Sequence, residues 1–255
     1  MNFKSLRLLA LALVCSGLQP LTASHQKCIL FGIKNVLLYP DMKKVSGGSL
    51  GGLLGFTPEK VEKELFETLE PININSFPIY TRTYPAVIEA WLTGYLSNDE
   101  THDVTHHYIK KHYSILSVKG ARLKTAVNIA FSDQQAKTFS VYNDSVSLAH
   151  RCKQTGCTIA LCTSWNRESF NNLKRVQSGA LSFFDKSYVS GYCGMLAATP
   201  EFYDTIINEY GINNVVLVDI LPENIRAAKI RGIKTISFTS AAAAERELKK
   251  MGFLS

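Results

Sequence analysis

Polar side chains that could bind or transform a ligand stand within or directly after apolar segments of this 255-residue chain. They comprise one ammonium group, two hydroxyls and one carboxylate: Lys34, Thr163, Ser164 and Asp219. The apolar segments are residues 28–38, 157–162 and 215–218. Nearly continuous apolar runs with β-branched members are typical of strands buried on both faces. In parallel sheets, ligands bind in the crevice beyond the carboxyl ends of such strands.

The second half of the chain alternates these strands with helices. We expect helices over 145–154, 167–177, 200–210, 222–231 and 241–251, and further strands at 188–189 and 234–238. Strands that alternate with helices of about ten residues predict a parallel sheet covered by helices on both faces. The predicted fold class is therefore α/β, with a Rossmann-like sheet.

Residues 57–130 have a different character, because they contain helical patterns and no strong strand signal. A helical block inserted after the first strand predicts a cap domain over 42–140, and an α/β core made of 25–41 and 141–255. The glycine-rich run SGGSLGGLLG (46–55) lacks the Gly-Lys-Ser/Thr ending of a phosphate-binding loop. We interpret it as a hinge between the two domains.

The N-terminus has the pattern of an export signal. Lys4 and Arg7 precede a short apolar run (8–15), and small residues follow up to Ala23 and Ser24. We predict a signal peptide over 1–24, a secreted or periplasmic protein, and no stable membrane span after its removal, because the run is too short to cross a bilayer. An ordinary first helix or an uncleaved anchor is the alternative.

The net charge gives little support to nucleic-acid binding. Removing residues 1–24 takes away Lys4 and Arg7 and no acidic residue, so the formal net charge falls from +7 to +5, and the basic residues are scattered. We expect an unidentified ligand or protein partner instead. Five cysteines remain after residue 24, an odd number whose spacing predicts no disulfide pairing: Cys28, Cys152, Cys157, Cys162 and Cys193.

Four segments, taken in order, resemble the haloacid dehalogenase superfamily, in the branch with a helical cap inserted after the first strand. They are ILFGIKNVLL (29–38), ALCTSWNRESF (160–170), SGYCGMLAATPEFY (190–203) and VVLVDILPENIRAAKIRGIKTISF (215–238). The resemblance runs from about residue 28 to the C-terminus. It implies a strand-end aspartate that attacks phosphorus or carbon, a second aspartate that acts as acid and base in the phosphatases, and an Mg²⁺ ion.

The same resemblance places other residue types at most of these positions. Gly32 stands at the nucleophile, Lys34 at the acid/base aspartate, Ala197 at the lysine of the third motif and Ile220 at the second acid of the fourth. Thr163, followed by Ser164, and Asp219 keep the family's residue types. We therefore predict degenerate motifs with no intact catalytic set, no protein-bound metal and no cofactor, Mg²⁺ included.

Two functional hypotheses follow. The first is a catalytically inactive relative of phosphatases that binds a ligand or partner in the crevice between cap and core. The alternative is an active hydrolase that uses an unrecognised nucleophile. Lys34 and Asp219 would project from adjacent strands, so they could form an ion pair in place of the missing cation, unless Lys34 points to solvent.

Two further clusters are weaker candidates. His102 and His106 share a helix face, but the helical zinc signature requires a glutamate between its two histidines and a third ligand elsewhere. Cys162 precedes Thr163, but a reactive cysteine needs a base or a positively charged setting. We interpret the histidines as part of a polar helix and the cysteine as a buried apolar residue.

Overall fold

The computed structural model describes residues 26–45, 58–75, 77–78, 81, 83–114 and 116–254. The predicted signal peptide and the glycine-rich hinge lie outside these ranges. Among the helices of the described ranges, none has both the length and the apolar character that a bilayer span requires.

Five parallel strands form the central sheet, in the order β5-β4-β1-β6-β7. Their bounds are β1 (Cys28–Phe31), β4 (Thr158–Thr163), β5 (Lys186–Val189), β6 (Val215–Asp219) and β7 (Lys234–Ser237). Every residue of β1, β4 and β6 is buried. In this register Phe31 lies opposite both Leu161 and Val218, so these three strands end side by side at one edge of the sheet.

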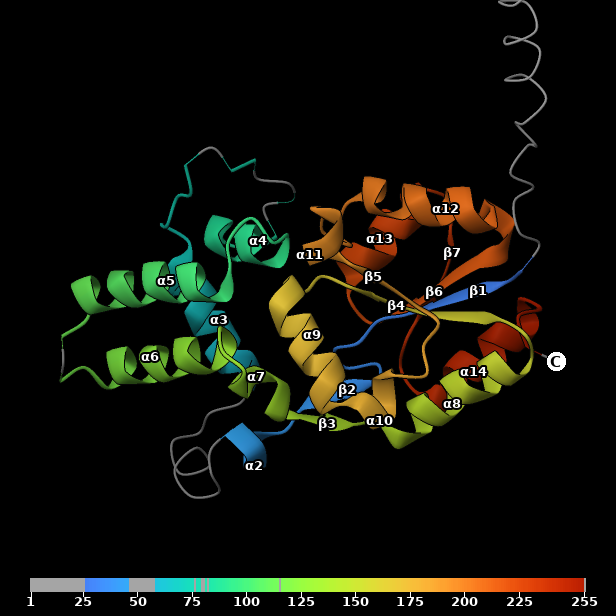
Figure 1. The fold of residues 1–255 in the computed structure, drawn as a ribbon, viewed down its shortest axis with the longest axis horizontal. Coiled ribbons are helices and arrows are strands. Elements are labelled where there is room, and N and C mark those ends of the chain that lie inside the picture. The colour runs from blue at the N-terminus through green and yellow to red at the C-terminus, as the bar shows by residue number, and fades with distance from the viewer. Residues whose placement is uncertain are drawn as a thin grey trace, which may run out of the picture.

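Helices cover both faces of the sheet, because alternate side chains of each strand point to opposite faces. Ile29 and Phe31 belong to a cluster that includes residues of α8 (Asn143–Gln154) and α14 (Ala241–Lys250). Cys28 and Leu30 belong to a cluster that includes residues of α12 (Asp204–Tyr210) and α13 (Pro222–Ile230). Figure 1 shows these two helix pairs on opposite sides of the strands. The predicted fold class is confirmed.

Further helical elements complete the region around the sheet. They are α9 (Arg167–Val176), α10 (Ser178–Leu181), α11 (Ser190–Cys193), η1 (Pro200–Tyr203) and η2 (Ile212–Asn214). Most predicted bounds after residue 143 differ from the observed ones by one or two residues, as is usual for such patterns. The exception is the helix expected over 200–210, whose first four residues form the 3-10 turn η1, so that α12 begins at Asp204.

A second group of helices packs beside the sheet around its own apolar cluster (Figure 1). They are α3 (Pro58–Leu69), α4 (Ala86–Leu92), α5 (Asn98–His112) and α6 (Val118–Ala130). Ser97 begins α5 with a capping box, in which its hydroxyl accepts from the Glu100 amide and the Glu100 carboxylate accepts from the Ser97 amide. We call α3–α6 the helical region. The domain boundaries near residues 41 and 141 stay a prediction.

The structure corrects the single strand expected over 28–38. The chain leaves the sheet at Gly32, whose amide donates to the Val218 carbonyl, and then turns through Asn35 at a φ of 60°. The Ile33 carbonyl accepts from the amides of Leu37 and Leu38 and closes this turn. The apolar run therefore spans a strand, a turn and the start of a second strand, since the apolar residues Ile33, Val36, Leu37 and Leu38 are buried in the turn as well as in the strand.

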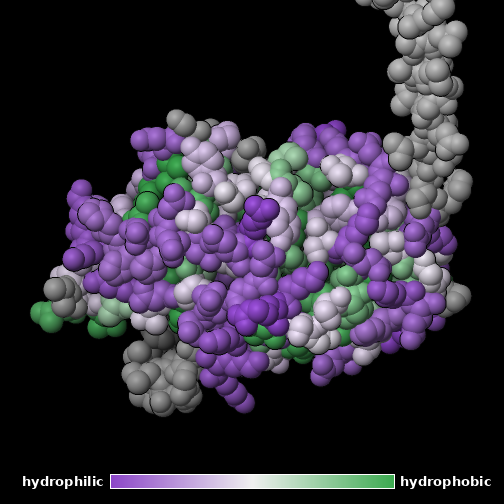
Figure 2. Space-filling view, viewed as in Figure 1, coloured by the Kyte–Doolittle hydropathy of each residue, from purple (hydrophilic) through white to green (hydrophobic). Residues whose placement is uncertain are grey.

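A two-stranded antiparallel ribbon follows the turn, made of β2 (Leu38–Pro40) and β3 (Phe139–Val141). The short helices α2 (Met42–Val45) and α7 (Gln134–Lys137) flank it. The ribbon brings the two chain segments that lead into and out of the helical region next to each other. On the face seen in Figure 2, hydrophilic side chains predominate over both parts of the molecule.

Candidate functional site

The predicted pocket positions meet at the carboxyl edge of the three central strands. Gly32 follows β1, Thr163 ends β4 and Asp219 ends β6, and β1 lies between the other two strands. Residues far apart in the sequence therefore meet at one place, as the parallel arrangement requires.

Gly32 lies directly against the carboxylate of Asp219. A Cβ atom built on Gly32 would lie 2.9 Å from Asp219 Cγ and 3.0 and 3.1 Å from its two oxygens. Such distances are shorter than ordinary contacts, so a larger residue at position 32 requires Asp219 to move. The carboxylate of β6 fills the space in front of the position where the resemblance places a nucleophile.

Hydrogen bonds hold Asp219 in this position. Its Oδ1 accepts from the amides of Ile220 (2.6 Å) and Leu221 (3.0 Å), and its Oδ2 accepts from Asn224 Nδ2 (2.9 Å). The side chain is 2% exposed. Burial raises the pKa of Asp219, and the three hydrogen bonds oppose that rise because they stabilise the carboxylate.

The remaining pocket positions differ in their accessibility. Ser164 Oγ accepts from the amide of Ala197 (3.0 Å), and Ala197 is fully buried, with its carbonyl accepting from the Tyr203 hydroxyl (2.9 Å). Thr163 is 7% exposed, whereas Ile220 is 38% exposed. These four positions contribute hydroxyl and apolar side chains and no charged group.

The predicted ion pair between Lys34 and Asp219 is wrong. Lys34 lies three residues beyond β1, in the turn, and its ammonium forms an ion pair with Glu62 of α3 at 2.5 Å. The turn at residues 33–37 displaces Lys34 from the strand end, so the lysine crosses to the helical region. Both partners are about one-third exposed, which makes this an accessible ion pair at the junction of the two regions.

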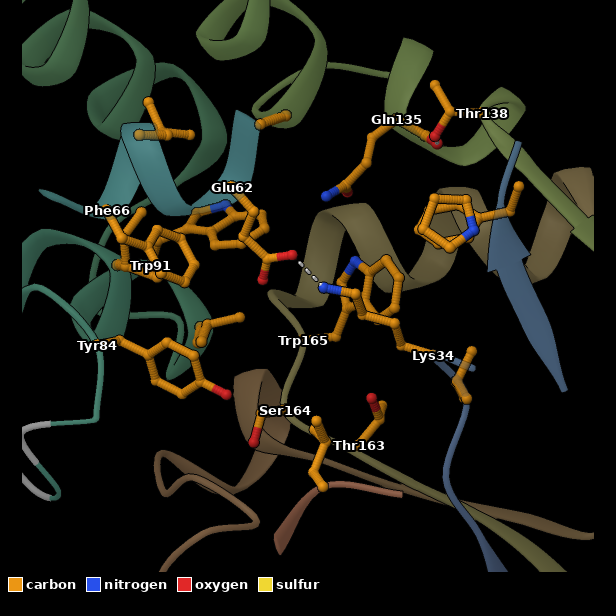
Figure 3. A pocket seen from close by; sticks show the side chains of 18 of the residues that line it. Lys34, Glu62, Phe66, Tyr84, Trp91, Gln135, Thr138, Thr163, Ser164 and Trp165 are labelled. Carbon is orange, nitrogen blue, oxygen red and sulfur yellow. Dashed lines mark hydrogen bonds and ion pairs between the residues drawn. The ribbon is translucent and has the colours of Figure 1, made fainter. Parts of the chain in front are cut away.

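A cavity of about 410 Å³ lies between the helical region and the sheet edge (Figure 3). Its polar lining residues are Lys34, Glu62, Tyr84, Gln135, Thr138, Thr163, Ser164, Asp219, Glu223 and Asn224. Apolar and aromatic side chains dominate the rest of the wall, among them Phe66, Ile88, Trp91, Phe131 and Trp165. The predicted positions Lys34, Thr163, Ser164 and Asp219 all line the cavity, while Gly32, Ala197 and Ile220 do not.

Side chains of the sheet region hold α4 and Trp165 against each other. Ser190 Oγ accepts from the Trp165 amide and contacts the Leu92 carbonyl, both at 2.7 Å. Asn166 Nδ2 donates to the carbonyls of Trp91 (3.0 Å) and Leu96 (3.2 Å). Ser190 and Asn166 are almost completely buried, and their polar side chains have hydrogen-bond partners. These bonds fix the position of the apolar wall that Trp91 and Trp165 form.

The cavity carries more acidic than basic groups. Among its described lining residues, Lys34 is the one cation, and it faces three carboxylates, those of Glu62, Asp219 and Glu223. The Tyr84 hydroxyl donates to Glu223 at 3.2 Å. Burial raises the pKa of Tyr84, and the carboxylate of Glu223 raises it further. The balance of charge is negative, which is unfavourable for a phosphate group.

Sequence reasoning missed the residues that the helical region contributes. Glu62, Tyr84 and Trp91 reach the cavity from α3, the segment before α4 and α4 itself, and no local pattern distinguishes them from other residues of amphipathic helices. Glu223 could have been predicted from the sequence, because it lies in the first turn of the helix that follows Asp219.

The two weaker candidates, the histidines of α5 and Cys162, have surroundings that give them no evident functional role. His102 contacts Asn128 Oδ1 at 2.9 Å and stacks on His106, on the exposed side of the helical region. Burial, with the nearby carboxylate of Asp219, raises the pKa of Cys162 well above its ordinary value, which keeps the thiol protonated and weakly nucleophilic. The five cysteines of the described residues are all unpaired.

Comparison of the sequence with known proteins identifies no relative. No protein-family model matches the chain, and no curated protein matches it.

Solved structures, by contrast, are similar in fold. An enzyme of the HAD (haloacid dehalogenase) family from Bacteroides thetaiotaomicron, solved as a magnesium complex, is 14% identical, with a TM-score of 0.54 over 85% of this chain and 94% of that one. A predicted HAD-like hydrolase from Porphyromonas gingivalis is 14% identical, with a TM-score of 0.52 over 89% and 99%. L-2-haloacid dehalogenase from Xanthobacter autotrophicus, with chloropropionic acid covalently bound, is 13% identical, with a TM-score of 0.50 over 89% and 86%.

This chain has the haloacid dehalogenase fold. The resemblance predicted from four sequence segments is confirmed at the level of the fold, since similar structures cover most of the chain. At such low identity the fold alone is shared, and the roles of individual residues do not follow from it.

The comparisons contradict the prediction that this protein has no place for Mg²⁺. The Bacteroides enzyme of this fold is a magnesium complex, and two further structures of it contain magnesium with inorganic phosphate. The prediction gave too much weight to one missing carboxylate. Magnesium keeps several water ligands and needs only one or two carboxylates, so glycine at position 32 does not exclude it.

Within the haloacid dehalogenase fold of this chain, Asp219 is the carboxylate at the central strand ends. Both of its oxygens already accept hydrogen bonds, and the described ranges contain no group of three or more metal-ligating side chains. The side chains present therefore match one ligand of a magnesium shell, and the other oxygens would have to come from backbone, water or a bound molecule.

Proposed function

We propose that this protein binds a small molecule in the cavity between its helical region and its sheet, and that it is catalytically inactive as a phosphatase. The observation that carries the proposal is the contact between Gly32 and Asp219, because it leaves neither a side chain nor free space where the fold's nucleophile is expected. The cavity beside it remains open and mainly apolar.

The size and composition of the cavity support binding. Small-molecule sites are typically clefts of a few hundred Å³ with apolar walls and a few convergent polar groups. The cavity of about 410 Å³ has this composition. Its walls come from two separately packed regions, and ligand sites commonly lie at such junctions.

Turnover measurements test the catalytic half of the proposal. We expect purified protein to release no phosphate from p-nitrophenyl phosphate above the buffer blank, either with EDTA or with Mg²⁺ added. Magnesium is included because the Bacteroides enzyme of the same fold binds it. Ordinary enzymatic turnover that depends on the added cation would contradict this half of the proposal.

Binding of an uncharged fluorescent probe tests the other half. We expect N-phenyl-1-naphthylamine to bind with increased emission, and the Ala130→Phe variant to lose that binding, because Ala130 lines the cavity. Ala121→Phe is the matched control, since Ala121 lies on the same helix and is exposed. Equal binding by both variants would show that the probe lies elsewhere.

An active hydrolase is the second candidate. The observation that favours it is that the similar structures include a magnesium-bound enzyme and a dehalogenase with chloropropionic acid covalently bound. Asp219→Asn separates the two candidates, because it removes the carboxylate and keeps the shape of the side chain. Turnover that this variant abolishes would support the hydrolase.

Export completes the proposal. Lys4, Arg7 and the apolar run after them support cleavage after Ala23 or Ser24. We expect the intact mass of the mature protein to correspond to a chain that begins at residue 24 or 25. A mature chain that retains residue 1 would contradict export by a cleaved signal.

A further inference from the structure

An indole N–H group in the cavity wall has no partner. Trp165 is 6% exposed, and its Nε1 makes no hydrogen bond within the described part of the chain. Buried donors in native proteins almost always have acceptors, and a buried donor without one costs about 1–3 kcal/mol. Trp91, the other tryptophan of the chain, also lines the cavity, but its Nε1 donates to Asn98 Oδ1 at 2.8 Å.

Polar groups from two other elements lie near this donor. Figure 3 shows Lys34, Gln135 and Trp165 extending into the same part of the cavity. The Lys34 ammonium already has the Glu62 carboxylate at 2.5 Å. The hydrogen bonds of Gln135 with other described residues are made by its backbone, so its side-chain amide is free to bind. Trp165 Nε1 is therefore the buried donor of this group that lacks an acceptor, and it lies next to a paired ammonium, a half-buried amide and an apolar wall.

The orientation of Trp165 is fixed before any ligand arrives. Its amide donates to Ser190 Oγ at 2.7 Å, and its ring packs against Phe139 with centroids 5.5 Å apart. A donor held in this way loses little conformational entropy when it forms a hydrogen bond. The wall thus contains a preorganised donor, which is what recognition of a single acceptor atom requires.

The charges in the cavity restrict that acceptor. Lys34 is neutralised by Glu62, and the carboxylates of Asp219 and Glu223 remain without a cation among the described residues. An anionic ligand would therefore lose its hydration and meet acidic groups, which is unfavourable in a cavity with a low effective dielectric. An uncharged acceptor avoids this cost.

We propose that the ligand is an uncharged, mainly apolar molecule with a carbonyl-type oxygen, and that the Trp165 indole N–H donates to that oxygen. This inference rests on the proposed small-molecule function and adds the class of ligand. The apolar part of the ligand contacts the aromatic wall that includes Phe66, Trp91 and Phe131. The side-chain amide of Gln135 supplies a second hydrogen-bonding group.

Four probes of nearly equal size test the ligand class by isothermal titration calorimetry. Acetophenone carries the carbonyl, α-methylstyrene replaces its oxygen with a methylene group, benzoate is anionic and 1-phenylethylammonium is cationic. We expect acetophenone to bind about tenfold more tightly than α-methylstyrene, the effect of one hydrogen bond to an otherwise unpaired donor. Benzoate binds most weakly.

The two tryptophans supply a direct readout of the hydrogen bond. Their indole N–H groups give two signals in a ¹H–¹⁵N correlation spectrum, which Trp91→Phe assigns. We expect acetophenone to move the Trp165 signal downfield by hydrogen bonding and α-methylstyrene not to do so. The Trp91 signal, already hydrogen-bonded to Asn98, is the internal reference.

Trp165→Phe keeps an aromatic ring and removes the donor. We expect this variant to reduce acetophenone affinity about tenfold and to leave α-methylstyrene affinity unchanged. Binding of both neutral probes with equal affinity, or tightest binding by benzoate or by 1-phenylethylammonium, would overturn the ligand class and leave the binding function intact. Binding of N-phenyl-1-naphthylamine by protein that binds none of the four probes would do the same. Absence of binding by all four probes, with N-phenyl-1-naphthylamine also unbound, would overturn the binding function itself.

Discussion

The two sides of the cavity differ in how their polar groups are satisfied. On the sheet side, Asp219 accepts three hydrogen bonds from its own strand end and the following helix, and it leaves no room in front of Gly32. On the side where the helical region meets the turn after β1, Lys34 pairs across the junction and the Trp165 indole stays unpaired. The sheet side is therefore closed in front of Gly32, whereas an unpaired donor remains in the wall on the other side.

This difference teaches that a position without a side chain need not leave an empty space. The carboxylate of Asp219 lies against Gly32 and is held there by its own hydrogen bonds. Buried polar groups are stable when every member of the network is satisfied, so the sheet side is fixed. Substitutions can test whether the Asp219 network is more rigid than the Lys34–Glu62 contact at the junction of the two regions.

The largest effect is expected for Asp219→Ala. The amides of Ile220 and Leu221 and the side chain of Asn224 lose their acceptor, so we expect the free energy of unfolding to fall by about 3 kcal/mol. Urea denaturation measures it. Asp133→Ala is the control, because Asp133 is exposed and makes no side-chain capping bond. Equal stability of the two variants would show that the network contributes nothing.

A smaller loss is expected for Gly32→Ala. The added Cβ would lie 2.9 Å from Asp219 Cγ, and overpacking of this kind costs about 2 kcal/mol. The control is Gly179→Ala in α10, where an added Cβ meets no atom within 4 Å.

A double-mutant cycle identifies the cause of that loss. In the Asp219→Ala background the new methyl group has space, so we expect Gly32→Ala to cost at least about 1 kcal/mol less there. Additive costs would mean that the methyl group contacts something other than Asp219.

The pH dependence of stability tests the burial of Asp219. Burial raises its pKa from the ordinary value of 3.8, so the folded state binds this proton more tightly than the unfolded state does. This contribution is fully present below the unfolded pKa and is lost as the pH rises through the folded pKa. We therefore expect wild-type stability to fall relative to Asp219→Asn as the pH rises from below 3.8, measured by urea denaturation. A constant difference would contradict the raised pKa.

The sheet was predictable because each strand is a local pattern. The runs that became β4 and β6 are almost continuously apolar and are followed by polar residues, so their bounds and the edge that carries Thr163 and Asp219 could be predicted. The turn after Gly32 was not visible, since its buried residues have the same composition as a strand. Hydrophobic composition reports burial and does not report local geometry.

The cavity could not be predicted for a related reason. Its Lys34–Glu62 contact joins residues that lie 28 positions apart and on different sides of the glycine-rich run. The contact depends on how α3 packs against the turn. Helix periodicity predicts which face of a helix is buried, but it does not predict which element packs against that face. The predicted Lys34–Asp219 pair was wrong because it assumed an uninterrupted strand.

The smallest effect is expected for the ion pair that joins the two regions. Lys34 and Glu62 are 35% and 38% exposed, so solvent screens their attraction, and exposed ion pairs contribute at most about 1 kcal/mol. We expect Lys34→Met and Glu62→Gln each to lower the free energy of unfolding by less than about 1 kcal/mol, and the coupling between them to shrink further in high salt. The exposed pair Lys250–Glu247 on α14 gives the matched comparison. A coupling as large as the Asp219 loss would mean that the junction is as rigid as the sheet side, which would remove the difference between the two sides of the cavity.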